Sequence, residues 1–449
     1  MYPRMPDLKK LTDELALYAQ LKAEYGAPGI APVLAAAERA LRASLAHLKK
    51  LPVNKTLRAR EPDDLERIRA LRPAGPRRLW QQFDAHAYRD RIAGALIGRM
   101  AGCTLGAPVE FWPVEKMQAL AEELGDAFPP TDYWRRVPDP HGKRYNVSRR
   151  EAYSRAGMAG VPVDDDIAYT LLGLLIAEDY GPAFTLDDVG NAWLQYLPYA
   201  CTAEDIALRN LKKGVPAAQA GARDNPYCEW IGADIRADPW GYMAPGWPEC
   251  AAAMAYRDAY LSHRRQGVYG AMFFAAAIAA AFCTSDPLEA LRIGLTEIPR
   301  DCALARAVRW ALRVAPTIKN HSQARAAVDA HFKGMSGVHT INNACLTIWG
   351  ITIGGTDFTR VIGETVAMGL DNDCTAATAG SIVGAVIGVK NIPARWYSRF
   401  NDTIHSYLIG KKRFSISGML RRFDQQARRV HRQPGVPGVA RTAARGGGR

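Results

Sequence analysis

The chain has 449 residues, which allows about two or three domains. Its hydrophobic content of 48% and charged content of 23% are ordinary for a soluble globular protein. The longest apolar run, residues 269–283, is shorter than the roughly 17 to 25 residues that a membrane helix needs, so it indicates a core helix. The net charge of +13 is unusual, and much of the excess lies near the chain ends.

Two features bear on the compartment. The eight cysteines show no Cys-x-x-Cys spacing and stand mostly in apolar surroundings, which indicates reduced, buried thiols. Residues 1–7 contain no apolar core of a signal peptide. We therefore expect a cytoplasmic protein.

Residues 1–82 are predicted to form a helical N-terminal extension. Residues 7–25 are amphipathic, and residues 31–48 are rich in alanine and leucine with basic residues on one side. Three prolines then interrupt the pattern. No residue pattern in this extension indicates chemistry.

Residues 83–427 are predicted to form a compact all-α domain of many helices. Alanine-rich segments follow one another, and the period-2 alternation of a β-strand is scarce. Glycines stand four apart near both ends of this region, so they share one helix face and let two backbones approach closely. They are Gly94, Gly98, Gly102 and Gly106 in the first helix and Gly380, Gly384 and Gly388 in the last.

Two long polar segments, residues 110–163 and 217–248, are predicted loops. Long loops inside a compact domain are usually functional. The second contains Trp230, Trp240 and Trp247. These aromatic side chains either stack on a base or sugar, or pack the loop onto the core.

Two carboxylate clusters stand where helices should begin. Asp164, Asp165 and Asp166 precede an apolar face with helical spacing, and Asp371 and Asp373 precede a run of small and apolar residues. Helix capping explains one aspartate at such a position, but not three in a row. Buried carboxylates repel one another, so the clusters are predicted to converge on divalent cations through hard oxygen ligands.

Residues 428–449 are predicted to be a disordered basic tail, because arginine, proline and glycine dominate there and apolar residues are few. Such a tail is either merely solvated or attracts a polyanion such as nucleic acid.

Four segments, in this order, resemble the ADP-ribosylglycohydrolase family, which includes the dinitrogenase reductase-activating glycohydrolases and the ADP-ribosylhydrolases. The resemblance covers about residues 83–400. The segments are GALIGRMAGCTLGAPVE at 94–110, DDDIAYTL at 164–171, YRDAYLSH at 256–263 and DNDCTAATAG at 371–380.

The resemblance implies two divalent cations, Mg²⁺ or Mn²⁺, at the bottom of a cleft. The family pattern has a hydroxyl residue before two aspartates, and Asp164 takes that hydroxyl position here. It also has Asp-x-Asp followed by a hydroxyl residue, a position that Cys374 takes, and Cys103 replaces a usual aspartate. The implied metal ligands are Asp164, Asp165, Asp166, Asp371, Asp373 and Cys374.

The resemblance also implies residues for catalysis and substrate binding. Glu110 matches a glutamate near the scissile bond, and we expect Glu110, Asp165 and Asp373 to be catalytic. Ser262 and His263 match a pair near the diphosphate, although a structural histidine inside the bundle is the alternative. Residues 232–238 resemble the family's phosphate-binding loop only loosely; from them Gly232, Asp234 and Arg236 are candidates, with a turn held by aspartates as the alternative.

The function implied is metal-dependent hydrolysis of a glycosidic bond at the anomeric carbon of a ribose, in ADP-ribose, an ADP-ribosylated protein or an ADP-ribosylated small molecule. Two alternatives stay open: a member that binds ADP-ribose or serves a structural role without turnover, and a hydrolase of another nucleoside-like substrate.

Overall fold

The structure is a computed structural model that describes residues 5–437. It divides into a smaller unit up to Ala59 and a larger unit from Arg60 onward. This division lies before the predicted boundary at residues 82 and 83. The reason is packing: Ile68 is fully buried, and Arg72 and Arg77 pair with the buried Glu297 of the larger unit.

The smaller unit contains the two long helices expected from the amphipathic pattern, α1 (Leu8–Glu24) and α2 (Ile30–Leu48). Asp7 caps α1 by accepting a hydrogen bond from the backbone N–H of Lys10. No residue in either helix is buried, so the leucines of this unit remain solvent-accessible. A third helix, α3 (Lys55–Arg60), spans the boundary between the units.

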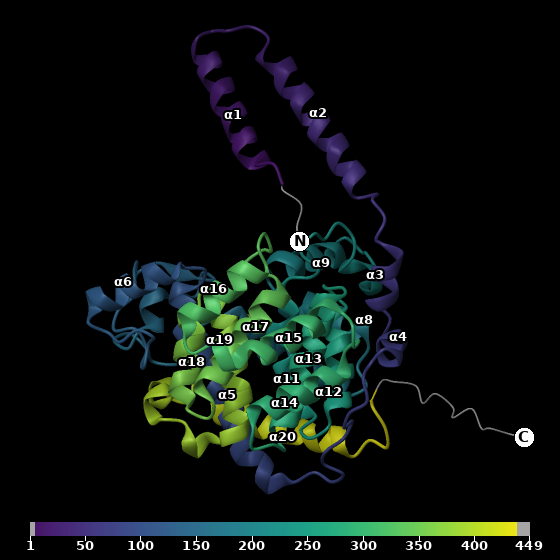
Figure 1. Ribbon diagram of the computed structural model, residues 1–449, viewed down its shortest axis with the longest axis vertical. Helices are drawn as coiled ribbons and strands as arrows, with labels where there is room; N and C mark the ends of the chain where they lie inside the picture. The colour runs from purple at the N-terminus through teal and green to yellow at the C-terminus, as the bar shows by residue number, and fades with distance from the viewer. Residues whose placement is uncertain (1–4, 438–449) are drawn as a thin grey trace, which may run out of the picture. The chain divides into compact units, whose positions relative to one another are not determined.

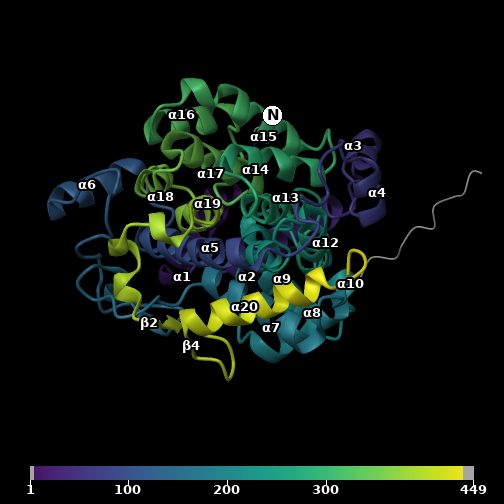
Figure 2. The same cartoon turned by 90° about the horizontal axis from the view of Figure 1, so that it is seen from below.

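The larger unit is built from helices, as the sequence predicts (Figure 1). Helices α13 (Gln266–Ala281), α17 (Thr340–Gly354) and α19 (Asn372–Ile387) lie near its middle in both views (Figures 1 and 2), and α5 (Ala85–Gly106) and α18 (Phe358–Ala367) pack against α19. The other helices are α4 (Leu65–Ala70), α6 (Val114–Leu124), α7 (Asp165–Tyr180), α8 (Leu186–Tyr196), α9 (Thr202–Lys212), α10 (Ala217–Ala220), α11 (Asp238–Met243), α12 (Pro248–Ala259), α14 (Pro287–Gly294), α15 (Ala303–Val314), α16 (His321–His331) and α20 (Ile416–His431).

Short elements complete the described chain. The 3-10 helices are η1 (Ala107–Val109), η2 (Arg150–Tyr153), η3 (Ile231–Arg236), η4 (Leu295–Glu297), η5 (Ala315–Thr317), η6 (Val389–Asn391), η7 (Ala394–Trp396) and η8 (Ser398–Phe400). Two antiparallel hairpins are the only sheets among residues 5–437: β1 (Lys143–Arg144) with β2 (Ser148–Arg149), and β3 (Ile404–His405) with β4 (Arg413–Phe414).

Helices α5 and α19 run antiparallel with their backbones in contact. A Cβ added to Gly94 would lie 2.1 Å from the carbonyl oxygen of Gly384, and one added to Gly98 would lie 2.1 Å from that of Gly380. The period-four glycines are therefore the contact surface of this pair, as their spacing predicts. The contact brings the C-terminal end of α5 beside the N-terminal end of α19.

Two apolar helices form the interior. Every residue of α13 is buried, which confirms the core helix predicted from the apolar run. The stretch Ala85–Val109 is long and apolar enough to cross a membrane by length and composition, but its apolar window is completely buried within the protein. Here α5 is a core helix packed most extensively against α19.

The predicted loops contain more structure than the sequence suggested. Residues 110–163 include helix α6 and the β1–β2 hairpin, so the reading of a continuous loop was wrong there. In the second segment, Trp240 and Trp247 are buried and pack that segment onto the core. Trp230 is only partly buried.

The larger unit continues past the predicted domain end at residue 427. Helix α20 reaches His431, because Val430 is buried against the body of the unit. The backbone oxygen of Pro437 accepts a hydrogen bond of 2.7 Å from Arg257. Residues 438–449 of the predicted tail lie outside the described residues, and polyanion contact by the tail stays a prediction.

Candidate metal and active site

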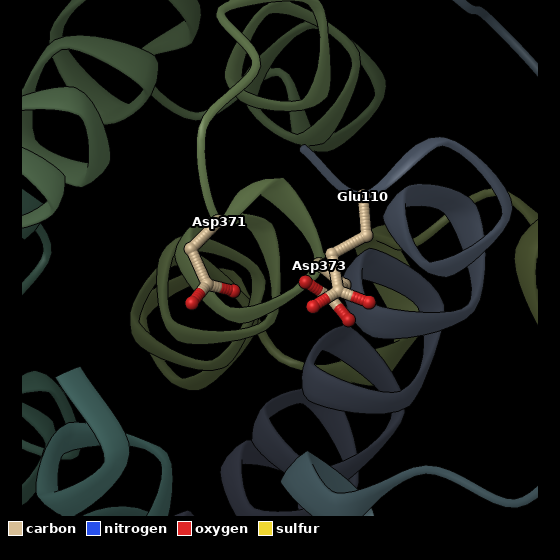
Figure 3. Close-up of side chains that lie close together, drawn as sticks. All are labelled: Glu110, Asp371 and Asp373. Carbon is tan, nitrogen blue, oxygen red and sulfur yellow. The ribbon is translucent and has the colours of Figure 1, made fainter. Parts of the chain in front are cut away.

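Six carboxylates gather near the C-terminal end of α5 and the N-terminal ends of α7 and α19. We call these residues the acidic centre: Glu110, Asp164, Asp165, Asp166, Asp371 and Asp373. They form two triads, Glu110 with Asp371 and Asp373, and Asp164 with Asp165 and Asp166. Within each triad one oxygen of every member lies within 4.8 Å of the others. Figure 3 shows the first triad, with Glu110 reaching from one chain segment toward the two aspartates of another.

The first triad is a consequence of the α5–α19 contact. A Cβ added to Gly106, the last residue of α5, would lie 2.5 Å from the Cα of Asp373. Just beyond, the backbone N–H of Phe111 donates a hydrogen bond of 3.0 Å to the carbonyl oxygen of Leu370. These backbone contacts therefore place Glu110 next to Asp371 and Asp373.

The second triad stands at the start of α7. Asp164 is the N-cap, and its side chain accepts a hydrogen bond from the backbone N–H of Asp166. Asp164 therefore caps α7 and also belongs to the carboxylate cluster. Helix capping explains the position of Asp164 but not those of Asp165 and Asp166. One arginine side chain contacts both triads, and in the second triad its partner is Asp164.

That arginine is Arg144, from β1. Its guanidinium donates hydrogen bonds of 2.8 Å to Glu110 and 2.8 Å to Asp164, and it lies 3.4 Å from Asp373. It also donates to the carbonyl oxygen of Ala107. The next residue, Tyr145, donates its hydroxyl to Asp165 at 2.6 Å.

A second arginine, Arg99, contacts the second triad from the interior of the protein. Arg99 of α5 is completely buried and donates to Asp238 and to the backbone oxygen of Asp166, each at 2.8 Å. It also donates to the hydroxyl of Thr170 at 2.7 Å. A buried guanidinium needs such partners because desolvation of an unpaired charge is costly. Arg99 therefore fastens the start of α7 to α5 and α11.

The electrostatics are those of crowded, buried acids. Burial, and then the charge of Asp164, raise the pKa of Asp165 to about 7. Burial also raises the pKa of Glu110, although Arg144 acts in the opposite direction. For Asp371 and Asp373, burial is again the main cause of a raised pKa. A cation that binds here relieves this mutual repulsion.

A cavity of about 190 Å³ opens onto the acidic centre. Glu110 and Asp165 are its partly exposed carboxylates, whereas Asp166, Asp371 and Asp373 are buried. The other residues that line it are Phe111, Tyr145, Tyr169, Cys201, Thr202, Glu204, Trp230, Ile231, Gly232, Ile235 and Val338. Trp230 and Gly232 thus reach the cavity from the second of the two predicted loops.

The predicted substrate-binding residues are not all at this cavity. Gly232 lines it, and an added Cβ there would collide with the carboxylate of Glu204. Arg236 is buried in ion pairs with Glu204 and Asp258, at 2.9 and 2.8 Å. Its guanidinium is therefore already satisfied within the protein.

Three further candidates lie in the same buried region. The hydroxyl of Ser262 accepts a hydrogen bond of 2.9 Å from Arg236 and lies 2.8 Å from Nδ1 of His263. Both residues are completely buried, as is nearly all of Asp234. None of these three lines the cavity, and their role in substrate binding stays a prediction.

The donor set fits a divalent cation. Hard oxygen ligands suit Mg²⁺ and Mn²⁺. Oδ1 of Asp373 is buried without a hydrogen-bond partner, and a bound cation would provide one.

Cys374, predicted as a ligand, belongs to neither triad among the described residues. Burial raises the pKa of its thiol well above the usual range, and the protonated thiol is a poor ligand.

Sequence reasoning missed Arg99, Arg144, Tyr145 and Glu204 as parts of the site. Basic residues carry no local signal that they will meet acids distant in the chain. One signal for Arg144 is its place in the long polar segment 110–163, because long loops inside a compact domain are usually functional.

His339, next to the cavity residue Val338, gives a pH-dependent prediction. Its Nδ1 caps α17 by accepting from the N–H of Ile341 at 3.1 Å, and burial lowers its pKa from 6.5 to about 4. The unfolded chain takes up the proton first, so stability is lost as pH falls through this range. Asparagine also caps a helix but does not titrate. As the pH falls from 7 to 4, the free energy of unfolding of His339→Asn should therefore rise relative to that of wild type by up to about 3 kcal/mol.

Urea unfolding at several pH values measures this difference. The control is His141→Asn at an exposed position, which should leave the pH dependence of wild type unchanged. A difference between His339→Asn and wild type that stays constant from pH 7 to pH 4 would contradict the assignment.

Comparison with known proteins places the chain in a family. A model of the ADP-ribosylglycohydrolase family matches residues 84–428. The match spans most of the chain, which therefore belongs to the ADP-ribosylglycohydrolase family. Among solved structures, one described as an "ADP-ribosylglycohydrolase-related protein complex" is 20% identical with a TM-score of 0.49, over 77% of this chain and 99% of that chain. Comparison with curated proteins gave no match.

Proposed function

We propose that the protein is a metal-dependent hydrolase that cleaves the glycosidic bond at the anomeric carbon of a ribose in an ADP-ribosyl group. The observation that carries this proposal is the acidic centre, in which five of the six carboxylates, all except Asp164, line one cavity. Membership of the ADP-ribosylglycohydrolase family supports the choice of an ADP-ribosyl substrate.

The bond cleavage develops positive charge on the anomeric carbon and the ring oxygen. Carboxylates at the bottom of a partly enclosed cavity stabilise such charge, because the low dielectric strengthens the attraction. Asp373 and Glu110 are placed to act in this way. A divalent cation bound by the acidic centre would supply orientation of the ribose hydroxyls and acidification of a water molecule.

Water must lose a proton as its oxygen bonds to the anomeric carbon. Of the two partly exposed carboxylates, Glu110 is held by the guanidinium of Arg144, whereas Asp165 accepts a hydrogen bond from the hydroxyl of Tyr145. Asp165 therefore retains more freedom to accept the proton, and Tyr145 orients it. The leaving group, such as a guanidinium or a hydroxyl oxygen, departs with the bonding electrons and takes up a proton.

A second candidate function is binding of ADP-ribose without turnover. The specific observation that favours it is the pairing of Glu110 with Arg144, because a glutamate committed to an ion pair is less available to the substrate. Both candidates use the same cavity and differ only in turnover.

The test is release of free ADP-ribose by the full chain from peptides ADP-ribosylated on arginine or on serine. The proposal expects release with Mn²⁺ or Mg²⁺ and its loss with EDTA, together with a higher melting temperature in the presence of metal. Binding of ADP-ribose with metal but without release from either peptide would support the second candidate. No binding and no release would reject both.

A further inference from the structure

The acidic centre contains a cation of its own, the guanidinium of Arg144. We propose that Arg144 takes the place of one divalent cation, so that the protein binds a single divalent ion at the Asp371–Asp373 side, and that Asp164 anchors Arg144 rather than a metal. This inference rests on the proposed metal site but not on turnover.

The guanidinium of Arg144 contacts both carboxylate triads and the backbone. Nη1 donates to Glu110 and to the carbonyl oxygen of Ala107, and Nη2 donates to Asp164 and reaches Asp373. The guanidinium therefore bridges the two triads. Only 13% of its side chain is exposed, so solvent screens these charges weakly.

Asp164 explains why the arginine is there. It stands at the position where the family pattern has a hydroxyl residue, and it adds a sixth carboxylate to the acidic centre. Its side chain is 1% exposed, and a buried carboxylate needs a close partner of opposite charge. Arg144 at 2.8 Å is that partner, and the additional negative charge is compensated within the protein.

The hairpin that carries Arg144 is fastened to the rest of the site. The ring of Tyr145 packs against those of Tyr199 and Tyr407, with centroids 6.2 and 5.4 Å away. The hydroxyl of Tyr199 donates to the backbone oxygen of Tyr145 at 3.0 Å. In β2, the hydroxyl of Ser148 accepts from the N–H of Val163, just before the second triad. Arg144 is therefore held in position by a hairpin that is fixed at Tyr145 and is joined through Ser148 to the residue before Asp164.

Asp373 offers a place for a cation. Oδ1 of Asp373 is buried without a hydrogen-bond partner, while Oδ2 faces Arg144. Asp373 belongs to the triad that contains Asp371. A second divalent ion on the other side would lie against the guanidinium, and the two like charges would repel each other in a poorly screened site.

The experiment titrates Mn²⁺ into metal-stripped full-length protein by calorimetry. Wild type and Arg144→Lys should bind one ion, because each keeps a positive charge at this position. Arg144→Met should bind two under the same conditions, with an affinity for the second ion at least about tenfold higher than the upper limit that the titration sets for a second ion in wild type. The matched control is Arg149→Met, which removes an exposed arginine from the partner strand of the same hairpin and should bind one ion.

Metal content after gel filtration in Mn²⁺ gives a second readout if Arg144→Met unfolds without metal. It should find two ions in Arg144→Met, or in Arg144→Gln if the methionine variant is not recovered, and one in wild type. Two ions in wild type, or equal metal content and affinity in wild type and the neutral variants, would overturn the proposal. Because no substrate is used, this result is independent of whether ADP-ribose is released.

Discussion

Asp373→Asn is expected to lower the rate of ADP-ribose release by about a thousandfold. Asparagine keeps the shape of the side chain but removes the charge of a carboxylate that lies in the first triad and faces both Arg144 and the cavity. The loss therefore reflects weaker metal binding and weaker stabilisation of the positive charge on the ribose. Single-turnover release of ADP-ribose in saturating Mn²⁺ measures it.

The same variant should remain folded. Burial and the nearby carboxylates, Glu110 first, raise the pKa of Asp373, so its negative charge costs folding free energy when no metal is bound. In EDTA, Asp373→Asn is expected to melt no lower than wild type, and Mn²⁺ should raise its melting temperature less. The control Asp187→Asn, at an exposed position of α8, should change neither property. Wild-type release together with undiminished stabilisation by Mn²⁺ would show that the site is misplaced.

Gly98→Ala is expected to destabilise the larger unit by about 3 kcal/mol. The added methyl group would lie 2.1 Å from the carbonyl oxygen of Gly380 and 3.2 Å from the ring of Phe358. Backbone atoms cannot turn away as a flexible side chain can, so α5 and α19 must separate. Chemical unfolding followed by circular dichroism measures the loss.

The matched control is Gly190→Ala in α8. There an added Cβ meets its nearest neighbour, a methyl carbon of Leu211, at the ordinary distance of 3.5 Å. Because alanine favours a helix over glycine by up to about 1 kcal/mol, this variant should be neutral or slightly stabilising. Equal stability of Gly98→Ala and Gly190→Ala would mean that the α5–α19 contact tolerates an added methyl group.

The sequence by itself determined the features that repeat along a helix or mark its start. Glycines four residues apart predicted a face of small residues on α5 and another on α19 that a neighbouring backbone can approach closely, because spacing of four is a property of the helix. That these two faces meet each other is seen only in the folded chain. Carboxylates before apolar helical patterns identified the starts of α7 and α19. Together these signals indicated an all-α fold and the convergence of two acidic clusters.

Only the tertiary structure decided which charges meet. Arg144 pairs with Glu110, Asp164 and Asp373, and these partners lie up to 229 residues away in the chain. Arg99 and Arg236 likewise find their acids on other helices. An ion pair depends on distance in space, which periodicity along a single segment does not encode. For that reason the sequence indicated an acidic site, whereas the arginine inside it became visible only in the folded chain.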